Sequence, residues 1–268
     1  MLPVHAAQPR RRASHALAGL LMVASVVLAG CQTKTAGLGG NDLTTASTSR
    51  TEVGGSFKKT GELARQWEAD RGNAKIGFAY ADQLDKLGQK PNAIAVIKAV
   101  ADENADKPDV QALAGRKLMA AGAFEEAAVA LERTVAANPK DYQALSALGS
   151  AYDQLGRHGE ARERYQKALA IKPDAVATRN NLAMSHALQG QLPEAEKMLR
   201  ELMSTGGSNA ARVRQNLALV VGLQGRFEEA KKIASEDLPP DQVEANLAYL
   251  QNMLSRPNTW KQLQDDKG

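Results

Sequence analysis

The stretch YQALSALGSAYDQLGRHGEARERYQKALAIKPDA, residues 142–175, decides the fold of this chain. Leu145, Leu148 and Tyr152 fall at positions i, i+3 and i+7, which form one apolar stripe of an α-helix. A second stripe follows Gly156, a residue free to adopt the positive φ at which the first helix stops. The stretch therefore predicts two antiparallel helices joined by a tight turn.

The same pattern recurs along the chain with a fixed period. Glycines stand at five equivalent positions separated by 34, 34, 34 and 35 residues, and an alanine follows each glycine after five residues. The glycines are Gly88, Gly122, Gly156, Gly190 and Gly225, and the alanines are Ala93, Ala127, Ala161, Ala195 and Ala230. This period is typical of stacked helix-turn-helix units, so the segment 74–238 is expected to hold five repeats.

The repeat resembles the tetratricopeptide repeat (TPR) family. The copy at 142–175 fills the family positions with Leu145, Leu148, Gly149, Tyr152, Gly156, Ala161, Tyr165, Ala168 and Pro173. It departs from the pattern at Leu145, where the family often has Trp, and at His158, where it often has an aromatic residue. The resemblance implies an all-α fold, a TPR α-α superhelix, which is a right-handed solenoid of antiparallel helix pairs with capping helices and one concave face.

Both ends of the repeat array carry candidate capping helices. A short helix from about Thr60 to Arg71, within the segment 57–73, places its apolar residues Leu63, Ala64 and Trp67 against the first repeat. In the segment 239–268, Asp241 and Glu244 resemble a capping box, and an apolar stripe follows before Pro257. The stripe consists of Val243, Leu247, Leu250 and Leu254. These helices are expected to cover the apolar ends of the stack.

Residues 1–30 have the features of an export signal. Arg10, Arg11 and Arg12 precede an apolar stretch, 16–30, that is too short to span a bilayer comfortably. An uncleaved anchor and twin-arginine export remain as alternative interpretations of these features.

The four residues Leu28-Ala29-Gly30-Cys31 resemble the lipobox of bacterial lipoproteins. The resemblance implies that Cys31 is acylated and becomes the N-terminus after cleavage. Gln32 follows where an inner-membrane retention signal would place Asp, so the expected location is the periplasmic face of the outer membrane. The segment 31–56 is rich in Thr, Ser and Gly and is expected to be a flexible lipid tether.

The charge of the chain argues against nucleic acid as a partner. Of 34 basic and 30 acidic residues, three arginines belong to the export signal, which leaves 31 basic residues and a net charge of +1. Such a domain lacks the basic field that releases counterions from nucleic acid. Because Cys31 is the only cysteine, the domain has no internal disulfide to stabilise it.

The residues after Cys31 contain no recognisable catalytic set. His158 and His186 are the only histidines there, and neither has a companion at metal-ligand spacing, so structural roles are expected for both. The pairs Glu125-Glu126 and Glu228-Glu229 stand at starts of second helices, where acids complement the helix dipole. The sequence therefore predicts a protein that is not an enzyme and that has no cofactor, metal or catalytic residue.

Function is expected to lie in the groove that first-helix residues line in TPR solenoids. At the equivalent positions the chain offers the candidate residues Ser146, Ser150, Asn180, Asn181, Met184, Arg212, Gln215 and Asn216, with Leu219 beside them. Amides along a groove can each donate and accept, which suits the main chain of an extended peptide. The alternative is that these asparagines are common fillers of the helix and bind only water. Since Lys75 and Arg212 stand alone, a peptide C-terminus is not the favoured ligand.

The layout of lipobox, polar tether and repeats resembles the TPR lipoproteins of pilus systems. Residues 66–89, which include Trp67, Tyr80 and Gly88, resemble the Tad-type (Flp) pilus assembly lipoproteins of the TadD family. The resemblance implies a pilotin-like assembly factor whose envelope partner is a secretin or another pilus component. The alternatives are a β-barrel assembly-type TPR lipoprotein and a regulatory subunit of a peptidoglycan-remodelling enzyme.

Overall fold

The computed structural model describes residues 45–205 and 210–255, and these residues form twelve helices and no strands. They divide into two compact units, an N-terminal unit of residues 45–155 and a C-terminal unit of residues 156–255. The boundary falls inside the repeat at 142–175. The export signal, Cys31 and the first part of the expected tether lie outside the described residues.

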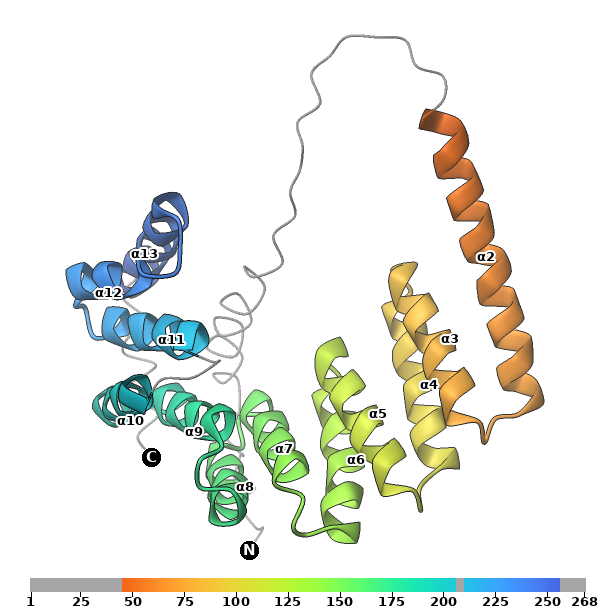
Figure 1. Ribbon diagram of the computed structural model, residues 1–268, viewed down its shortest axis with the longest axis horizontal. Helices are drawn as coiled ribbons and strands as arrows, with labels where there is room; N and C mark the ends of the chain where they lie inside the picture. Colours follow the sequence, from red (N-terminus) through yellow and green to blue (C-terminus); the bar gives the residue numbers. More distant parts are fainter. Residues whose placement is uncertain (1–44, 206–209, 256–268) are drawn as a thin grey trace, which may run out of the picture. The chain divides into compact units, whose positions relative to one another are not determined.

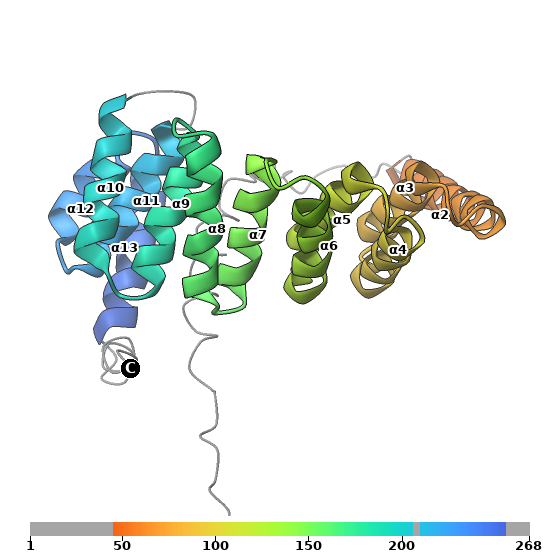
Figure 2. The same cartoon turned by 90° about the horizontal axis from the view of Figure 1, so that it is seen from below.

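The N-terminal unit consists of a long first helix followed by helices that pack on their neighbours in chain order (Figures 1 and 2). Helix α3 pairs with α4, α5 pairs with α6, and α7 packs on both α6 and α5. The bounds are α2 Thr45–Ala69, α3 Ala74–Lys86, α4 Lys90–Glu103, α5 Pro108–Ala121, α6 Phe124–Ala137 and α7 Tyr142–Gln154.

The C-terminal unit continues the same hairpin packing. Helix α9 packs on α8 and α10, α11 packs on α10 and α12, and α13 packs on α11 and α12. The bounds are α8 His158–Ile171, α9 Val176–Leu188, α10 Leu192–Thr205, α11 Ala210–Leu223, α12 Phe227–Ala234 and α13 Pro240–Ser255. Each unit therefore shows the helical hairpins that the 34-residue period predicts.

The five periodic glycines are the positive-φ residues of the described chain, with φ between 73° and 81°. Gly122 shows their role, since it caps α5 in the left-handed conformation and its N–H donates to carbonyls of the last turn, those of Leu118 and Met119. Glycine reaches this conformation without the Cβ penalty that other residues meet. The prediction that Gly156 adopts positive φ is confirmed, because its φ is 74°.

The core of the N-terminal unit begins at Trp67 on α2, which is 5% exposed. Its ring lies 6.0 Å from that of Tyr80 on α3, and the guanidinium of Arg71 lies 4.5 Å above it. The cluster that contains Trp67 extends through α3 and α4 to Leu118 on α5. Helix α2 therefore covers the first repeat with Trp67, as the sequence predicts.

The start of α2 differs from the sequence-based expectation. The helix begins at Thr45 rather than near Thr60, so backbone that was assigned to the tether is helical from residue 45. Once a helix is nucleated, each added residue gains a hydrogen bond without a new nucleation cost. The helix formed at 60–69 can therefore continue through the Thr- and Ser-rich residues before it.

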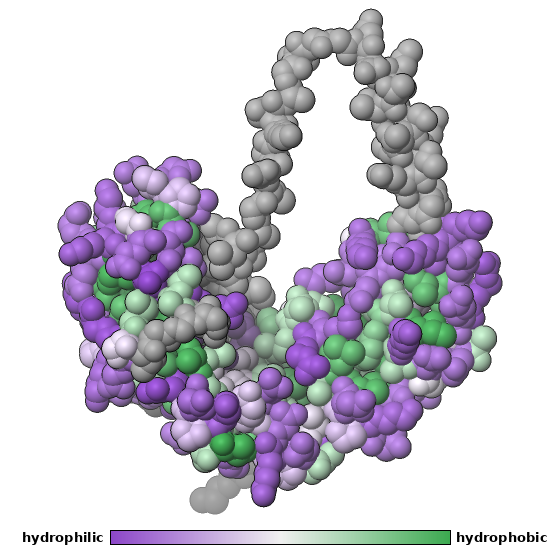
Figure 3. All heavy atoms as spheres, viewed as in Figure 1, coloured by the Kyte–Doolittle hydropathy of each residue, from purple (hydrophilic) through white to green (hydrophobic). Residues whose placement is uncertain are grey.

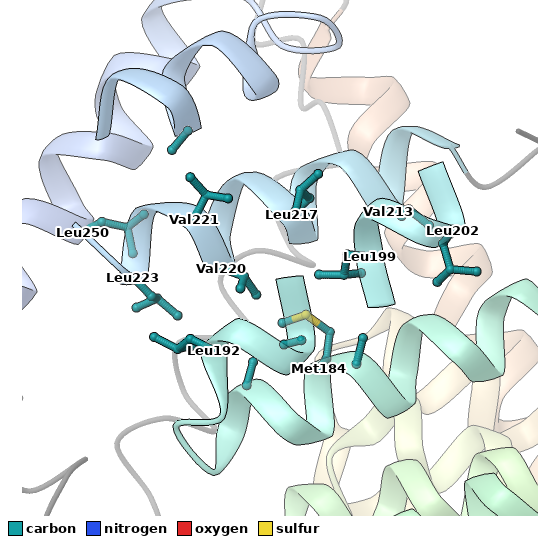
Figure 4. Packing of buried hydrophobic residues seen from close by; sticks show 14 residues of the cluster. Met184, Leu192, Leu199, Leu202, Val213, Leu217, Val220, Val221, Leu223 and Leu250 are labelled. Atoms are coloured by element: carbon teal, nitrogen blue, oxygen red, sulfur yellow. The ribbon is translucent and has the colours of Figure 1, made fainter. Parts of the chain in front are cut away.

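The core of the C-terminal unit lies between α9, α10, α11 and α13 (Figure 4). Leu199 on α10 and Val220 on α11 are fully buried there. From α13, Val243 is 1% exposed and Leu250 is 6% exposed. The stripe predicted for this helix thus covers the last repeat.

The visible face of each unit is mainly hydrophilic, with smaller hydrophobic patches (Figure 3). Among residues 45–205 and 210–255, no helix combines the length and the apolar character that crossing a bilayer requires.

Candidate functional site

The predicted groove residues lie in both units. Ser146 and Ser150 are on α7 of the N-terminal unit. The other six are on α9 and α11 of the C-terminal unit, and they are Asn180, Asn181, Met184, Arg212, Gln215 and Asn216. We refer to these six residues as the α9–α11 face.

The two serines are half-buried on α7. The hydroxyl of Ser150 donates to the backbone carbonyl of Ser146 at 3.2 Å. This bond lies within one turn of the same helix, where serine commonly bonds the carbonyl four residues earlier. The bond gives Ser150 a structural role within α7.

Asn180 and Asn216 form a hydrogen-bonded pair between α9 and α11. The Nδ2 of Asn216 donates to the Oδ1 of Asn180 at 2.9 Å. The two residues are 36 positions apart, close to one repeat period, so equivalent faces of successive first helices meet here. Asn180 is 4% exposed and Asn216 is half-buried. The structure thus joins two predicted site residues and makes Asn180 the inner member of the pair.

Apolar side chains underlie this amide pair. Met184 is 8% exposed and belongs to the core of the C-terminal unit, where Figure 4 shows it directed from α9 toward α11. Leu219 packs against the same cluster. The structure therefore places Met184 in the core beneath the α9–α11 face, because its long apolar side chain gains more from burial than from exposure.

The remaining members of the face are more accessible. Asn181 and Gln215 are half-buried, and Arg212 is exposed. Arg212 and Asn216 are four residues apart on α11, so they occupy the same side of that helix. The α9–α11 face is thus a polar surface with amide groups, one exposed guanidinium and an apolar base.

A charged network lies elsewhere in the C-terminal unit, between α10 and α12. Glu196 accepts hydrogen bonds from Arg226 and from Gln224, both at 2.7 Å, and pairs with Arg200 at 2.6 Å. Glu229 pairs with the same two arginines at 2.5 and 2.6 Å. Burial opposes ionisation of Glu196, but the bonds from Arg226, Gln224 and Arg200 outweigh it and lower the pKa of Glu196 to about 2.

Sequence reasoning missed this network. It assigned Glu229 to a solvated helix start, which is correct for its position in the first turn of α12 but omits its two arginine partners. The available signal was the spacing on single elements, because Glu196 and Arg200 are four residues apart on α10 and Arg226 and Glu229 are three residues apart at the start of α12. The network joins two helices and therefore has a structural role.

The histidines and acids of the described chain show no metal-binding arrangement. The Nδ1 of His186 lies 2.5 Å from the Oε1 of Gln191, in the turn that follows α9. Among residues 45–205 and 210–255, no group of three His, Cys, Asp or Glu side chains is placed to hold a metal ion.

Family models for the tetratricopeptide repeat match residues 112–176 and 154–219. Curated relatives include human Superkiller complex protein 3, which is 26% identical over 148 residues that cover 54% of this chain and 10% of the relative. The peroxisomal targeting signal receptor of Kluyveromyces lactis is 33% identical over 143 residues, or 53% of this chain and 24% of the relative. Human protein O-mannosyl-transferase TMTC1 is 43% identical over 60 residues, or 22% of this chain and 7% of the relative. The matches thus span a quarter or less of these relatives.

Solved structures share the fold at low sequence identity. A tetratricopeptide repeat protein from Parabacteroides merdae has a TM-score of 0.60 at 17% identity, covering 82% of this chain and 88% of that one. A thermophilic TPR protein from Thermus thermophilus has a TM-score of 0.53 at 21% identity, covering 66% of this chain and 98% of that one. The family models thus identify tetratricopeptide repeats within residues 112–219, and the solved structures show that the described chain has the fold of tetratricopeptide-repeat proteins.

Proposed function

We propose that this chain is a non-catalytic scaffold for protein-protein interaction and that its α9–α11 face holds an extended segment of the partner. The carrying observation is the 2.9 Å hydrogen bond between Asn216 and Asn180 over an apolar base. TPR repeats in general imply a role in protein-protein interaction. What we add is that the α9–α11 face is the surface that binds the partner.

The amide pair has the chemistry that an extended main chain needs. Each asparagine amide has two donor hydrogens and an acceptor oxygen, and the bond to Asn180 uses one hydrogen of Asn216. The second hydrogen and the Oδ1 of Asn216 can pair with a peptide C=O and N–H. The bond also fixes the orientation of the Asn216 side chain, which reduces the entropy lost on binding.

The absence of catalysis is part of the proposal. It is supported by the charged groups of the C-terminal unit, since Glu196 and Glu229 are held in ion pairs between helices. One matched relative is named a transferase, but the match covers 7% of its length.

The cellular role that we propose is that of a lipid-anchored, pilotin-like assembly factor of a Tad-type pilus at the periplasmic face of the outer membrane. Its supports are the lipobox at residues 28–31 and the resemblance of residues 66–89 to the TadD family. The expected partner is a secretin or another pilus-assembly component, and no nucleic acid is expected to bind.

Replacing both Asn181 and Asn216 by alanine is expected to weaken partner binding at least tenfold, because two amides that pair with the partner main chain are lost. The partner is first captured from solubilised membranes with the wild-type chain. Its dissociation constant is then measured for both proteins by calorimetry.

Asn246→Ala provides the matched control, since Asn246 is an exposed asparagine on α13 of the same unit. It should leave the affinity unchanged. Equal affinity of the double variant and the wild type would refute a binding role for the α9–α11 face.

The Cys31→Ser variant tests the lipid anchor. Since serine has no thiol to receive the diacylglyceryl group, the variant should take up no labelled fatty acid and should leave the outer-membrane fraction. The proposed anchor would be wrong if the wild-type chain took up no labelled fatty acid. It would also be wrong if the variant still fractionated with the outer membrane.

A further inference from the structure

We propose that the segment held by the α9–α11 face carries an acidic side chain and that Arg212 binds this carboxylate. This inference rests on the proposed function of the face and adds the chemical class of the partner. An internal Asp or Glu of the partner is the ligand group, rather than a chain terminus.

The first observation in support is the charge of helices α9 and α11. Helices α9 and α11 contain Arg179, Arg212 and Arg214 and no acidic residue. Neither helix therefore has a carboxylate of its own, and any neutralising partner of these arginines must come from another part of the chain. Charge complementarity of this kind selects acidic partners and suppresses basic ones.

The ion pairs decide which arginine is available. The Nη2 of Arg179 lies 4.0 Å from the Oε2 of Glu201 on α10. Arg214 is 18% exposed and pairs with Glu236, at 2.9 Å, and with Asp237. No ion pair of Arg212 occurs within residues 45–205 and 210–255, where its side chain is exposed. Arg212 is thus the member of the three whose charge is not neutralised by a described neighbour.

The position of Arg212 relates it to the amide pair. It precedes Asn216 by four residues, so the guanidinium lies one helical turn from the amide on the same side of α11. That side faces α9, because Asn216 bonds Asn180 there. A segment whose main chain pairs with Asn216 therefore has a nearby side chain within reach of Arg212.

An arginine suits this task because its planar guanidinium can bind a carboxylate through two parallel hydrogen bonds. A glutamine at position 212 would keep a similar length and hydrogen-bonding capacity but lose the charge. A lysine would keep the charge and lose the paired geometry. The two substitutions therefore separate attraction by charge from recognition by the guanidinium.

The test uses random 12-residue peptides displayed on phage, each fused at its C-terminus to the coat protein so that no terminal carboxylate is free. Selection is carried out on the immobilised full chain and, in parallel, on the Arg212→Gln variant. A selected peptide is then synthesised with an amidated C-terminus, both as selected and with its acidic residue changed from Glu to Gln or from Asp to Asn. Affinities are measured for wild type, Arg212→Gln and Arg212→Lys.

Enrichment of Asp or Glu at one peptide position on wild type, and its loss on Arg212→Gln, is the expected result. Neutralising that peptide residue should weaken wild-type binding about tenfold and should change binding to Arg212→Gln by less than twofold. Arg212→Lys should fall between the two proteins.

Binders that depend on Asn216 but show no acidic preference would overturn this inference and leave the proposed function standing. Failure to select any peptide would count against both the inference and the proposed function.

Discussion

Gly115→Ala is expected to lower the free energy of unfolding of the N-terminal unit by about 2 kcal/mol, although alanine is the better helix former. Gly115 lies within α5, and a Cβ added there would meet the Cγ of Leu131 on α6 at 2.6 Å. Leu131 is fully buried, so it has little room to move away. The measurement is urea denaturation followed by circular dichroism, with amide hydrogen exchange to locate the loss in α5 and α6.

Gly61→Ala is the matched control for this substitution. Gly61 is also a helical glycine of the N-terminal unit, but a Cβ added there has no neighbour within 4 Å. The control should stabilise α2 by a few tenths of a kcal/mol to about 1 kcal/mol through helix propensity. If both variants raised stability equally, the close approach of α5 and α6 at Gly115 would be disproved.

Glu196→Gln is expected to destabilise the C-terminal unit by about 2 kcal/mol at pH 7. The substitution removes the charge that Arg200 and Arg226 share, while the side chain keeps its shape. Hydrogen exchange should accelerate mainly in α10 and α12, the two helices that the network joins.

The effect of Glu196→Gln should depend on pH in a definite direction. The folded-state pKa of Glu196 is lowered to about 2 from an ordinary value of 4.5, so the folded state holds the carboxylate more tightly in its charged form. Its stabilising contribution is complete above about pH 4.5 and is lost as the pH falls toward 2. The stability gap between wild type and variant should therefore shrink over that interval.

Glu194→Gln supplies the control for the charge change itself. Glu194 is exposed in the first turn of the same helix, and its neutralisation should change stability by less than about 0.5 kcal/mol. A gap between Glu196→Gln and wild type that stayed constant from pH 7 to pH 2.5 would contradict the assigned pKa.

Prediction from the sequence succeeded for features that depend only on residues within one repeat or one helix. The turn at Gly156 could be predicted because that position requires positive φ. The capping helix on the last repeat could be predicted because Val243 and Leu250 lie on one side of the same helix. Prediction was less accurate at the start of α2, where helix elongation depends on a balance of small terms that no periodic residue marks.

The candidate site was predicted only in part, because it depends on contacts between helices that are far apart in the sequence. Repeat positions selected Asn180 and Asn216 one by one, but their bond depends on the side-chain orientations of two helices 36 residues apart. Likewise, the sequence does not show that Arg179 has an acidic partner on α10 and that Arg214 has acidic partners in the turn after α12, while Arg212 remains exposed. Those pairings follow from how α9 and α11 pack on their neighbours.

The sequence by itself determined the all-α class, the 34-residue repeat, the positions of the hairpin turns and the stripes that become buried, since backbone conformation and apolar periodicity are local properties. Only the tertiary structure decided which polar side chains face one another, which charges are neutralised and which side chain of the α9–α11 face lies beneath its surface. Burial and ion pairing are set by the neighbours that packing brings together, and a single repeat does not contain them.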